Sequence, residues 1–198
     1  MSGNLELRRL WDLPTRLFHW ALAVTVIVGW YLGEYRDFST IDLHFYFGYA
    51  TAGLLTFRII WGIFGPPHAR LSALLPGAGR LFSYARNMFR RQPSGYPGHN
   101  PIGALSVLAM LLSLIVQVLT GLIAEDDGLF AEGPLREYVS ESLSLNANLI
   151  HYWNSWLILV LVGLHISAIT FYLFWKHENL IKPMITGWKP VKRNSQTD

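Results

Sequence analysis

Four long apolar stretches constrain the fold of this chain more than any other feature. They lie at about residues 13–33, 43–64, 102–124 and 149–175. Each is close to the roughly 20 residues that an α-helix needs to cross the hydrocarbon core of a bilayer. In a chain of 198 residues with only 15% charged residues, no amphipathic shell remains to cover four such helices in water. We therefore predict an all-α fold, a transmembrane four-helix bundle forming one domain over residues 1–198.

The absence of cysteine narrows the chemistry that the chain can support. Disulfides, iron–sulfur clusters and the covalent attachment of c-type haem are all excluded. A bound metal would have to rest on histidine, carboxylate or methionine side chains. The net charge of +3 does not indicate nucleic acid, because the basic residues lie in the connections between apolar runs, where they set membrane topology.

Lysine and arginine residues divide the segments outside the apolar runs into two groups. Three segments hold nearly all of them: Arg8, Arg9 and Arg16; Arg70, Arg80, Arg86, Arg90 and Arg91; and Lys176, Lys182, Lys189, Lys192 and Arg193. The other two connections hold only Arg36 and Arg136 among many acidic residues. By the positive-inside rule, we predict that both termini are cytoplasmic and that the two acidic connections lie outside.

The two longer connections carry helical patterns of their own. Residues 74–89 mix leucine, phenylalanine, tyrosine and methionine with arginine, a pattern typical of an amphipathic helix on the cytoplasmic membrane surface. In the outer connection, residues 133–143 predict a short acidic helix, since Pro134 suits a first helical position. We expect no further domain in either connection.

Four of the seven histidines, His19, His44, His151 and His165, fall inside or at the ends of the predicted spans. Ionisable groups at membrane depth are costly and usually face the bundle interior with a functional partner. Neutral imidazole is a standard axial ligand of haem iron. A lone membrane histidine would more often hydrogen-bond a neighbouring helix, but four at matched depths favour metal ligation.

The depths of these histidines predict how they pair. His151 and His165 are fourteen residues apart on one helix, so they share a face and lie roughly 21 Å apart along its axis. His44 begins the second span from outside, at the level of His151, and His19 lies near the level of His165. We predict two metal-binding pairs, His44 with His151 and His19 with His165, each clamping one haem b.

Further residues are candidates for contacts with these cofactors. Arg16 and Arg58 could neutralise haem propionates, and Gly48 is one of several glycines that leave room for a flat ring. The remaining glycines of this kind are Gly29, Gly33, Gly53, Gly121 and Gly163. His99, at the start of the third span, is a candidate to hydrogen-bond a quinone carbonyl or a propionate.

Several motifs together resemble a known family. They are residues 11–20 (WDLPTRLFHW), 44–49 (HFYFGY), 57–62 (FRIIWG), 98–101 (GHNP) and 178–184 (ENLIKPM). They resemble the bacterial cytochrome b561 family, in the branch that includes the cytochrome b subunits of nickel–iron hydrogenases. The resemblance covers nearly the whole chain. It implies that histidines of the first, second and fourth helices bind haem, which carries over onto His19, His44, His151 and His165.

The resemblance also implies a function in the bacterial inner membrane. We expect transmembrane electron transfer through two bis-histidine b-type haems that links the quinone pool to a redox partner, a hydrogenase or a c-type cytochrome. The chain would be a subunit of an oxidoreductase complex and would be surrounded by membrane lipid. It could also form a homodimer. Two alternatives stay open: a stand-alone superoxide:quinone oxidoreductase, and a non-haem metal transporter or membrane anchor.

Overall fold

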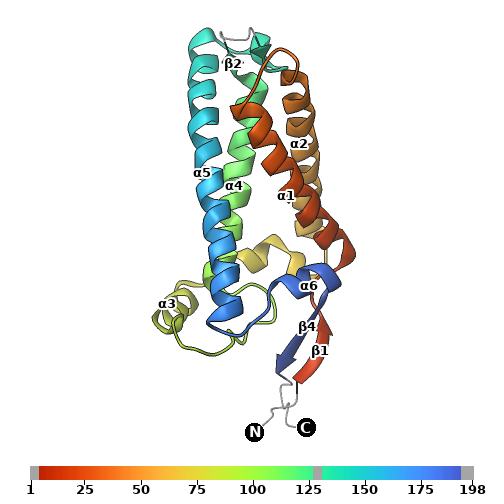
Figure 1. Cartoon of the computed structure of the whole chain (residues 1–198), viewed down its shortest axis with the longest axis vertical. Helices are drawn as coiled ribbons and strands as arrows, with labels where there is room; N and C mark the ends of the chain where they lie inside the picture. The colour runs from red at the N-terminus through yellow and green to blue at the C-terminus, as the bar shows by residue number, and fades with distance from the viewer. Residues whose placement is uncertain (1–4, 127–130, 193–198) are drawn as a thin grey trace. The chain divides into compact units, whose positions relative to one another are not determined.

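Within residues 5–126 and 131–192, which the computed structural model describes, four helices are long and apolar enough to cross a membrane. They are α1 (Leu13–Glu34), α2 (Ile41–Phe64), α4 (Pro101–Ile123) and α5 (Glu141–Phe174) (Figure 1). The predicted all-α transmembrane fold is confirmed. The first three helices begin and end within two residues of their predicted bounds.

The chain forms two compact units, each built from separate segments of the sequence. The helical unit comprises Phe18–Ile59 and Ala109–Gly163, and thus holds segments of all four long helices. The terminal unit comprises Met1–Leu17, Ile60–Leu108 and Leu164–Asp198. The prediction of a single domain over the whole chain stays a prediction.

In the helical unit, many large apolar side chains point outward rather than into a core. Leu119, Val160 and Ile27 keep more than half of their surface exposed. In water this exposure would be costly, whereas lipid chains are as apolar as these side chains. The outward surface of these helices is therefore suited to a bilayer.

Helix α5 begins eight residues before the predicted start of the fourth span. The hydroxyl of Ser140 accepts a hydrogen bond from the backbone N–H of Leu143 at 3.3 Å, as a helix-capping serine does. The first two turns of α5 alternate polar residues with leucine and alanine, so a continuous apolar run did not include them. The short acidic helix predicted from Pro134 is present only as a 3-10 helix (Arg136–Tyr138), which precedes α5, and β2 (Glu125–Asp126) pairs with β3 (Ala131–Glu132).

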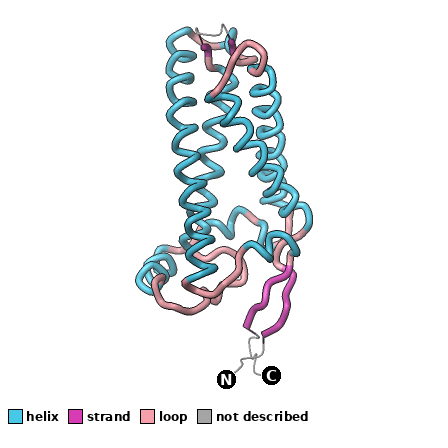
Figure 2. The backbone as a smooth tube through the Cα atoms, in the orientation of Figure 1, coloured by secondary structure: helices cyan, strands magenta, loops and turns pink. Residues whose placement is uncertain are grey.

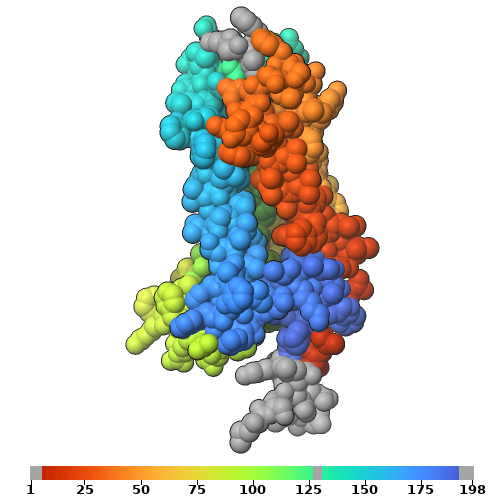
Figure 3. All heavy atoms as spheres, viewed as in Figure 1, coloured from red at the N-terminus to blue at the C-terminus, as the bar shows by residue number. Residues whose placement is uncertain are grey.

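The terminal unit contains a strand pair and a short helix that the hydropathy pattern did not predict. Strand β1 (Leu5–Arg9) pairs antiparallel with β4 (Trp188–Lys192), so two segments from opposite parts of the sequence lie side by side (Figure 2). The short helix α6 (Ile181–Thr186) precedes β4, and Figure 3 shows this C-terminal segment in blue against the red of β1.

A glycine fixes the junction between α6 and β4. Gly187 has φ of +87°, a left-handed conformation that favours glycine. Its carbonyl accepts hydrogen bonds from the backbone N–H groups of Leu10 at 2.9 Å and Trp11 at 3.3 Å. A β-carbon on Gly187 would lie 2.7 Å from the carbonyl oxygen of Trp11, so this junction excludes larger residues.

The helix predicted within residues 74–89 is confirmed as α3 (Ala78–Asn87). Two 3-10 turns (Pro67–Ala69 and Leu71–Leu74) connect α2 to it. One side of α3 contributes the buried Tyr84, while Phe82 is 73% exposed. Its position on the membrane surface stays a prediction.

Candidate functional site

The imidazole rings of His44 on α2 and His151 on α5 face one another inside the helical unit. Their ring centroids lie 6.1 Å apart, with an angle of 81° between the ring planes. Two metal–nitrogen bonds of about 2 Å each, together with the half-widths of two rings, place the centroids of trans imidazole ligands roughly 6 Å apart. The spacing therefore fits one metal atom held between the two rings.

Both rings are oriented by hydrogen bonds to backbone carbonyls of the neighbouring helix. Nδ1 of His44 lies 2.9 Å from the carbonyl oxygen of Gly29, and Nδ1 of His151 lies 2.9 Å from that of Gln117. Because a carbonyl oxygen only accepts, each Nδ1 carries the proton. Nε2 of each ring is then the nitrogen available to a metal, the usual arrangement of a ligating histidine.

Glycines make room for both rings. A β-carbon on Gly33 would lie 2.8 Å from Cε1 of His44, and one on Gly121 would lie 2.8 Å from Cε1 of His151. Each glycine follows the residue whose carbonyl orients the ring, Gly29 or Gln117, by one helical turn. Both glycines also line the cavity beside the two histidines, so their predicted role in leaving room for a porphyrin stays a prediction.

A cavity of about 450 Å³ opens onto both histidines, within the range of about 300–1,000 Å³ usual for cofactor sites. All four long helices contribute to its walls, which also include Trp30 and the predicted Gly48. A β-carbon on Gly48 would meet no atom within 4 Å, so the wall is open there. Two trans imidazoles and a largely apolar cavity fit a haem.

Hydrogen bonds between α4 and α5 stabilise the His151 side of the cavity. Asn154, one turn beyond His151, donates to the backbone carbonyl of Ser113 at 2.9 Å and to the side-chain oxygen of Gln117 at 2.7 Å. The hydroxyl of Ser113 donates to Asn154 Oδ1 at 2.7 Å. Gln117 thus orients His151 with its backbone while its side chain is held by Asn154.

The second predicted pair is divided between the two units. His19 belongs to the helical unit, where its ring meets that of Trp20 edge-on with 5.0 Å between centroids. His165 belongs to the terminal unit. Their pairing therefore stays a prediction. Arg58 is buried in the helical unit, as expected for a charge with a structural or cofactor role.

Arg16 and His99 both lie in the terminal unit. Arg16 donates to the backbone carbonyl of Ile185, which ties the first turn of α1 to α6. The ring of His99 lies 4.9 Å from that of Trp11, centroid to centroid. The proposed contacts of Arg16 with a propionate and of His99 with a quinone are not tested by this geometry.

Sequence reasoning missed the backbone acceptors at Gly29 and Gln117. Every residue carries a backbone carbonyl group, so the residue type does not identify an acceptor. Only the spacing between the acceptor residue and a following glycine could have indicated it. The signal is an acceptor residue followed four positions later by glycine, Gly29 to Gly33 in α1 and Gln117 to Gly121 in α4. In both cases the histidine lies on the next long helix.

Comparison with known proteins agrees with this geometry. The family described as prokaryotic cytochrome b561 matches residues 10–187. The chain is 25% identical to a probable Ni/Fe-hydrogenase B-type cytochrome subunit of Azotobacter vinelandii, over 92% of this chain and 88% of the relative. It is 26% identical to a protein of the same description from Rhizobium leguminosarum bv. viciae, over 92% and 89%. The chain belongs to the prokaryotic cytochrome b561 family, and is a multi-pass membrane protein of the b-type cytochrome class.

Proposed function

We propose that this chain carries electrons across the bacterial inner membrane through two bis-histidine b-type haems, between the quinone pool and a hydrogenase. The observation that carries the proposal is the pair of facing imidazoles of His44 and His151, 6.1 Å apart, with each Nδ1 bonded to a carbonyl. If a haem iron is bound there, His44 and His151 would both hold it, and an iron held by two protein ligands favours electron transfer over oxygen chemistry.

The protein's own groups would hold one haem rigidly. Preset imidazole orientations reduce the reorganisation that accompanies a change of iron charge. The walls of the cavity are largely apolar, as a porphyrin ring requires. When bound, the haem supplies the one-electron redox chemistry.

The second haem is assigned to His19 and His165 on the strength of their depths in α1 and α5. The proposal places both termini in the cytoplasm and the His44–His151 pair near the outer surface, following the distribution of basic residues. The acidic outer connection is suited to a basic surface on a partner protein. The hydrogenase is proposed because relatives over nearly the whole chain carry that description.

Haem content of the purified chain tests the proposal. We expect two haems b per chain and a reduced-minus-oxidised spectrum with a b-type α-band. His44→Ala and His151→Ala should each remove one haem and leave the same residual spectrum. His19→Ala and His165→Ala should both remove the other haem. A chain without any b-type α-band would contradict the proposal, and a His44→Ala protein that retains two haems would contradict the first assignment.

The electron partners need a separate measurement. Membranes containing the chain and its hydrogenase should reduce quinone with hydrogen, and His151→Ala should abolish this activity. Acidic residues are numerous in the outer connections, where only Arg36 and Arg136 are basic, so an anionic donor such as superoxide is disfavoured. Quinone reduction by superoxide with the purified chain alone would contradict that preference.

A further inference from the structure

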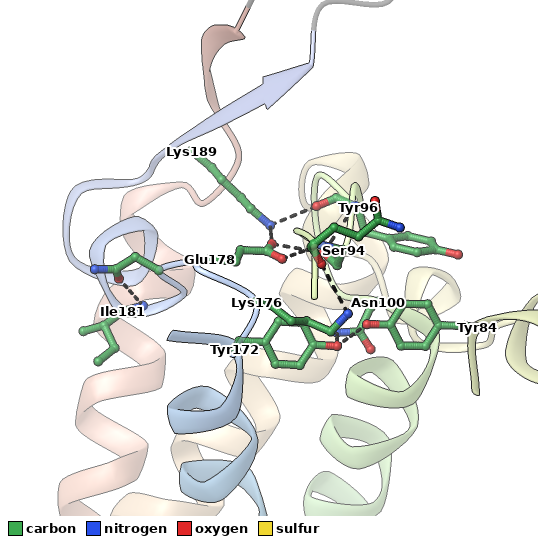
Figure 4. A network of polar contacts seen from close by, with 11 residues as sticks. Tyr84, Ser94, Tyr96, Asn100, Tyr172, Lys176, Glu178, Ile181 and Lys189 are labelled. Carbon is green, nitrogen blue, oxygen red and sulfur yellow. Dashed lines mark hydrogen bonds and ion pairs between the residues drawn. The ribbon is translucent and has the colours of Figure 1, made fainter. Parts of the chain in front are cut away.

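Lys176 is a buried cation whose charge no carboxylate neutralises among the described residues. Its side chain lies just beyond the end of α5, with the residue only 3% exposed. Nζ donates to the backbone carbonyls of Arg90 at 3.2 Å and Gln92 at 3.4 Å. It also lies 5.6 Å from the centre of the Tyr172 ring (Figure 4). A buried ammonium held only by neutral acceptors favours an added anion.

Glu178, two residues after Lys176, already has partners for its carboxylate. Glu178 forms an ion pair with Lys189 at 2.8 Å and accepts hydrogen bonds from the N–H of Ser94 at 2.7 Å and its hydroxyl at 3.0 Å. Burial raises the pKa of Glu178, but the bonds from Lys189 and Ser94 outweigh it and lower that pKa below its ordinary value. Glu178 is thus ionised and committed to Lys189.

A polar cavity of about 210 Å³ adjoins Lys176 within the terminal unit. Ser83, Asn87 and Arg90 contribute to its wall from α3 and the residues that follow. The remaining lining residues are Tyr84, Gln92, Pro93, Ser94 and Tyr96. The wall thus holds two cationic side chains and no carboxylate. Since a water molecule takes about 30 Å³, the cavity has room for a phosphate group with several waters.

An apolar edge lies beside this cavity. Ser83 and Asn87 lie one turn apart on α3, and Phe82 precedes Ser83 on the same helix. Phe89 and Arg90 follow the end of α3. Phe82 is 73% exposed and Phe89 is 70% exposed. In a membrane protein, exposed aromatic rings beside a cationic pocket match the acyl chains and the headgroup of a phospholipid.

We propose that this cavity binds the phosphate group of an anionic phospholipid, with Lys176 and Arg90 as the cationic partners and Phe82 and Phe89 against its acyl chains. A bound lipid would join α3 to the segment that follows α5. The site is independent of the histidine cavity, because its lining residues all belong to the terminal unit.

Native mass spectrometry of the haem-loaded full chain in detergent, titrated with phosphatidylglycerol or phosphatidylcholine, tests the proposal. Two basic groups predict a preference of about tenfold or more for phosphatidylglycerol. Lys176→Met should remove most of this preference. Lys182→Met is the matched control, because Lys182 is exposed in α6 and changes the net charge equally. Equal preference in Lys176→Met and wild type would overturn the site.

Two further arms keep the test decisive. If Lys176→Met fails to fold, Arg90→Gln removes the exposed cation of the same cavity and should weaken the binding of phosphatidylglycerol several-fold. Unchanged binding in Arg90→Gln would count against the site. Inorganic phosphate separates the headgroup from the lipid: it should compete only weakly. The contrary result is that inorganic phosphate competes as strongly as phosphatidylglycerol, with the double substitution Phe82→Ser and Phe89→Ser leaving this competition unchanged. That result would show a free-phosphate site and overturn the lipid assignment.

Discussion

The helix pairs α1–α2 and α4–α5 hold their histidines by the same means but are stabilised differently. In both, a carbonyl of the first helix orients the imidazole of the second, and a glycine one turn later clears the ring. The α4–α5 pair adds the side-chain hydrogen bonds of Asn154 with Ser113 and Gln117.

The α1–α2 pair depends instead on a short turn of six residues between Glu34 and Ile41. Asp37 stabilises that turn by accepting hydrogen bonds from the N–H groups of Ser39 at 2.8 Å and Thr40 at 3.0 Å. The hydrogen bond from the Ser39 hydroxyl, together with these N–H groups, keeps the pKa of Asp37 below its ordinary value. The comparison shows that a helix pair that orients a histidine can be stabilised in two ways. One is a short turn between the helices, and the other is a set of side-chain hydrogen bonds along them.

The largest effect should come from filling the space beside either ring. Gly33→Ala and Gly121→Ala place a β-carbon 2.8 Å from an imidazole, so the ring or a helix must shift. Overpacking of about 1–3 kcal/mol would weaken haem binding roughly 5- to 150-fold. Haem retention during dilution of the purified chain measures this.

Gly79→Ala in α3 is the control for both glycine variants, because a β-carbon there meets no atom within 4 Å. It should retain haem as the wild type does. Equal haem retention in Gly33→Ala and Gly79→Ala would mean that the imidazole of His44 does not need the clearance, and the two helix pairs would then differ in this respect.

A smaller effect should distinguish the two pairs. Asn154→Leu leaves Gln117 without its donor and removes the bonds to Ser113, at a cost of about 0.6–2 kcal/mol for hydrogen bonds within a membrane. Thermal unfolding in detergent, followed by haem absorbance, should show a lower midpoint. Ser155→Ala should leave the midpoint unchanged, because the Ser155 hydroxyl donates to the Tyr152 carbonyl of its own helix.

Loss of one contact to His151 should shift its haem potential slightly. The hydroxyl oxygen of Thr120 lies 3.2 Å from Nδ1 of His151. The same Nδ1 makes its shorter hydrogen bond, 2.9 Å, to the carbonyl oxygen of Gln117. Thr120→Val should change the midpoint potential by less than about 60 mV, a tenfold change in a one-electron equilibrium. A redox titration measures the shift, with Thr25→Val on the α1 side as control, since that hydroxyl bonds to Leu22.

The smallest effect is expected at the ion pair of Arg36 with Asp126. Their side chains meet at 2.6 Å but are 40% and 22% exposed, so solvent screens the attraction. Arg36→Gln should lower the free energy of unfolding by less than about 1 kcal/mol. Unfolding at low and high salt checks this value. A much larger loss would show that Arg36 has a further partner in the cavity, such as a haem propionate.

Much of this fold follows from local patterns in the sequence. A span of the bilayer needs a long apolar helix, so the four runs determined the four helices and most of their ends. The histidines were found in the same way, because an ionisable side chain stands out in an apolar run. The β1–β4 pair was missed because five-residue strands at opposite ends of a chain have no local signal that links them.

By itself, the sequence determined that four helices cross a membrane and that His44 and His151 are candidate ligands. Only the tertiary structure decided that these two rings face one another, that Gly29 and Gln117 orient them, and that Gly33 and Gly121 make room for them. The reason is physical: helix formation depends on the side chains and hydrogen bonds of neighbours along the chain. A metal-binding pair depends on which faces of distant helices meet, and packing alone sets that.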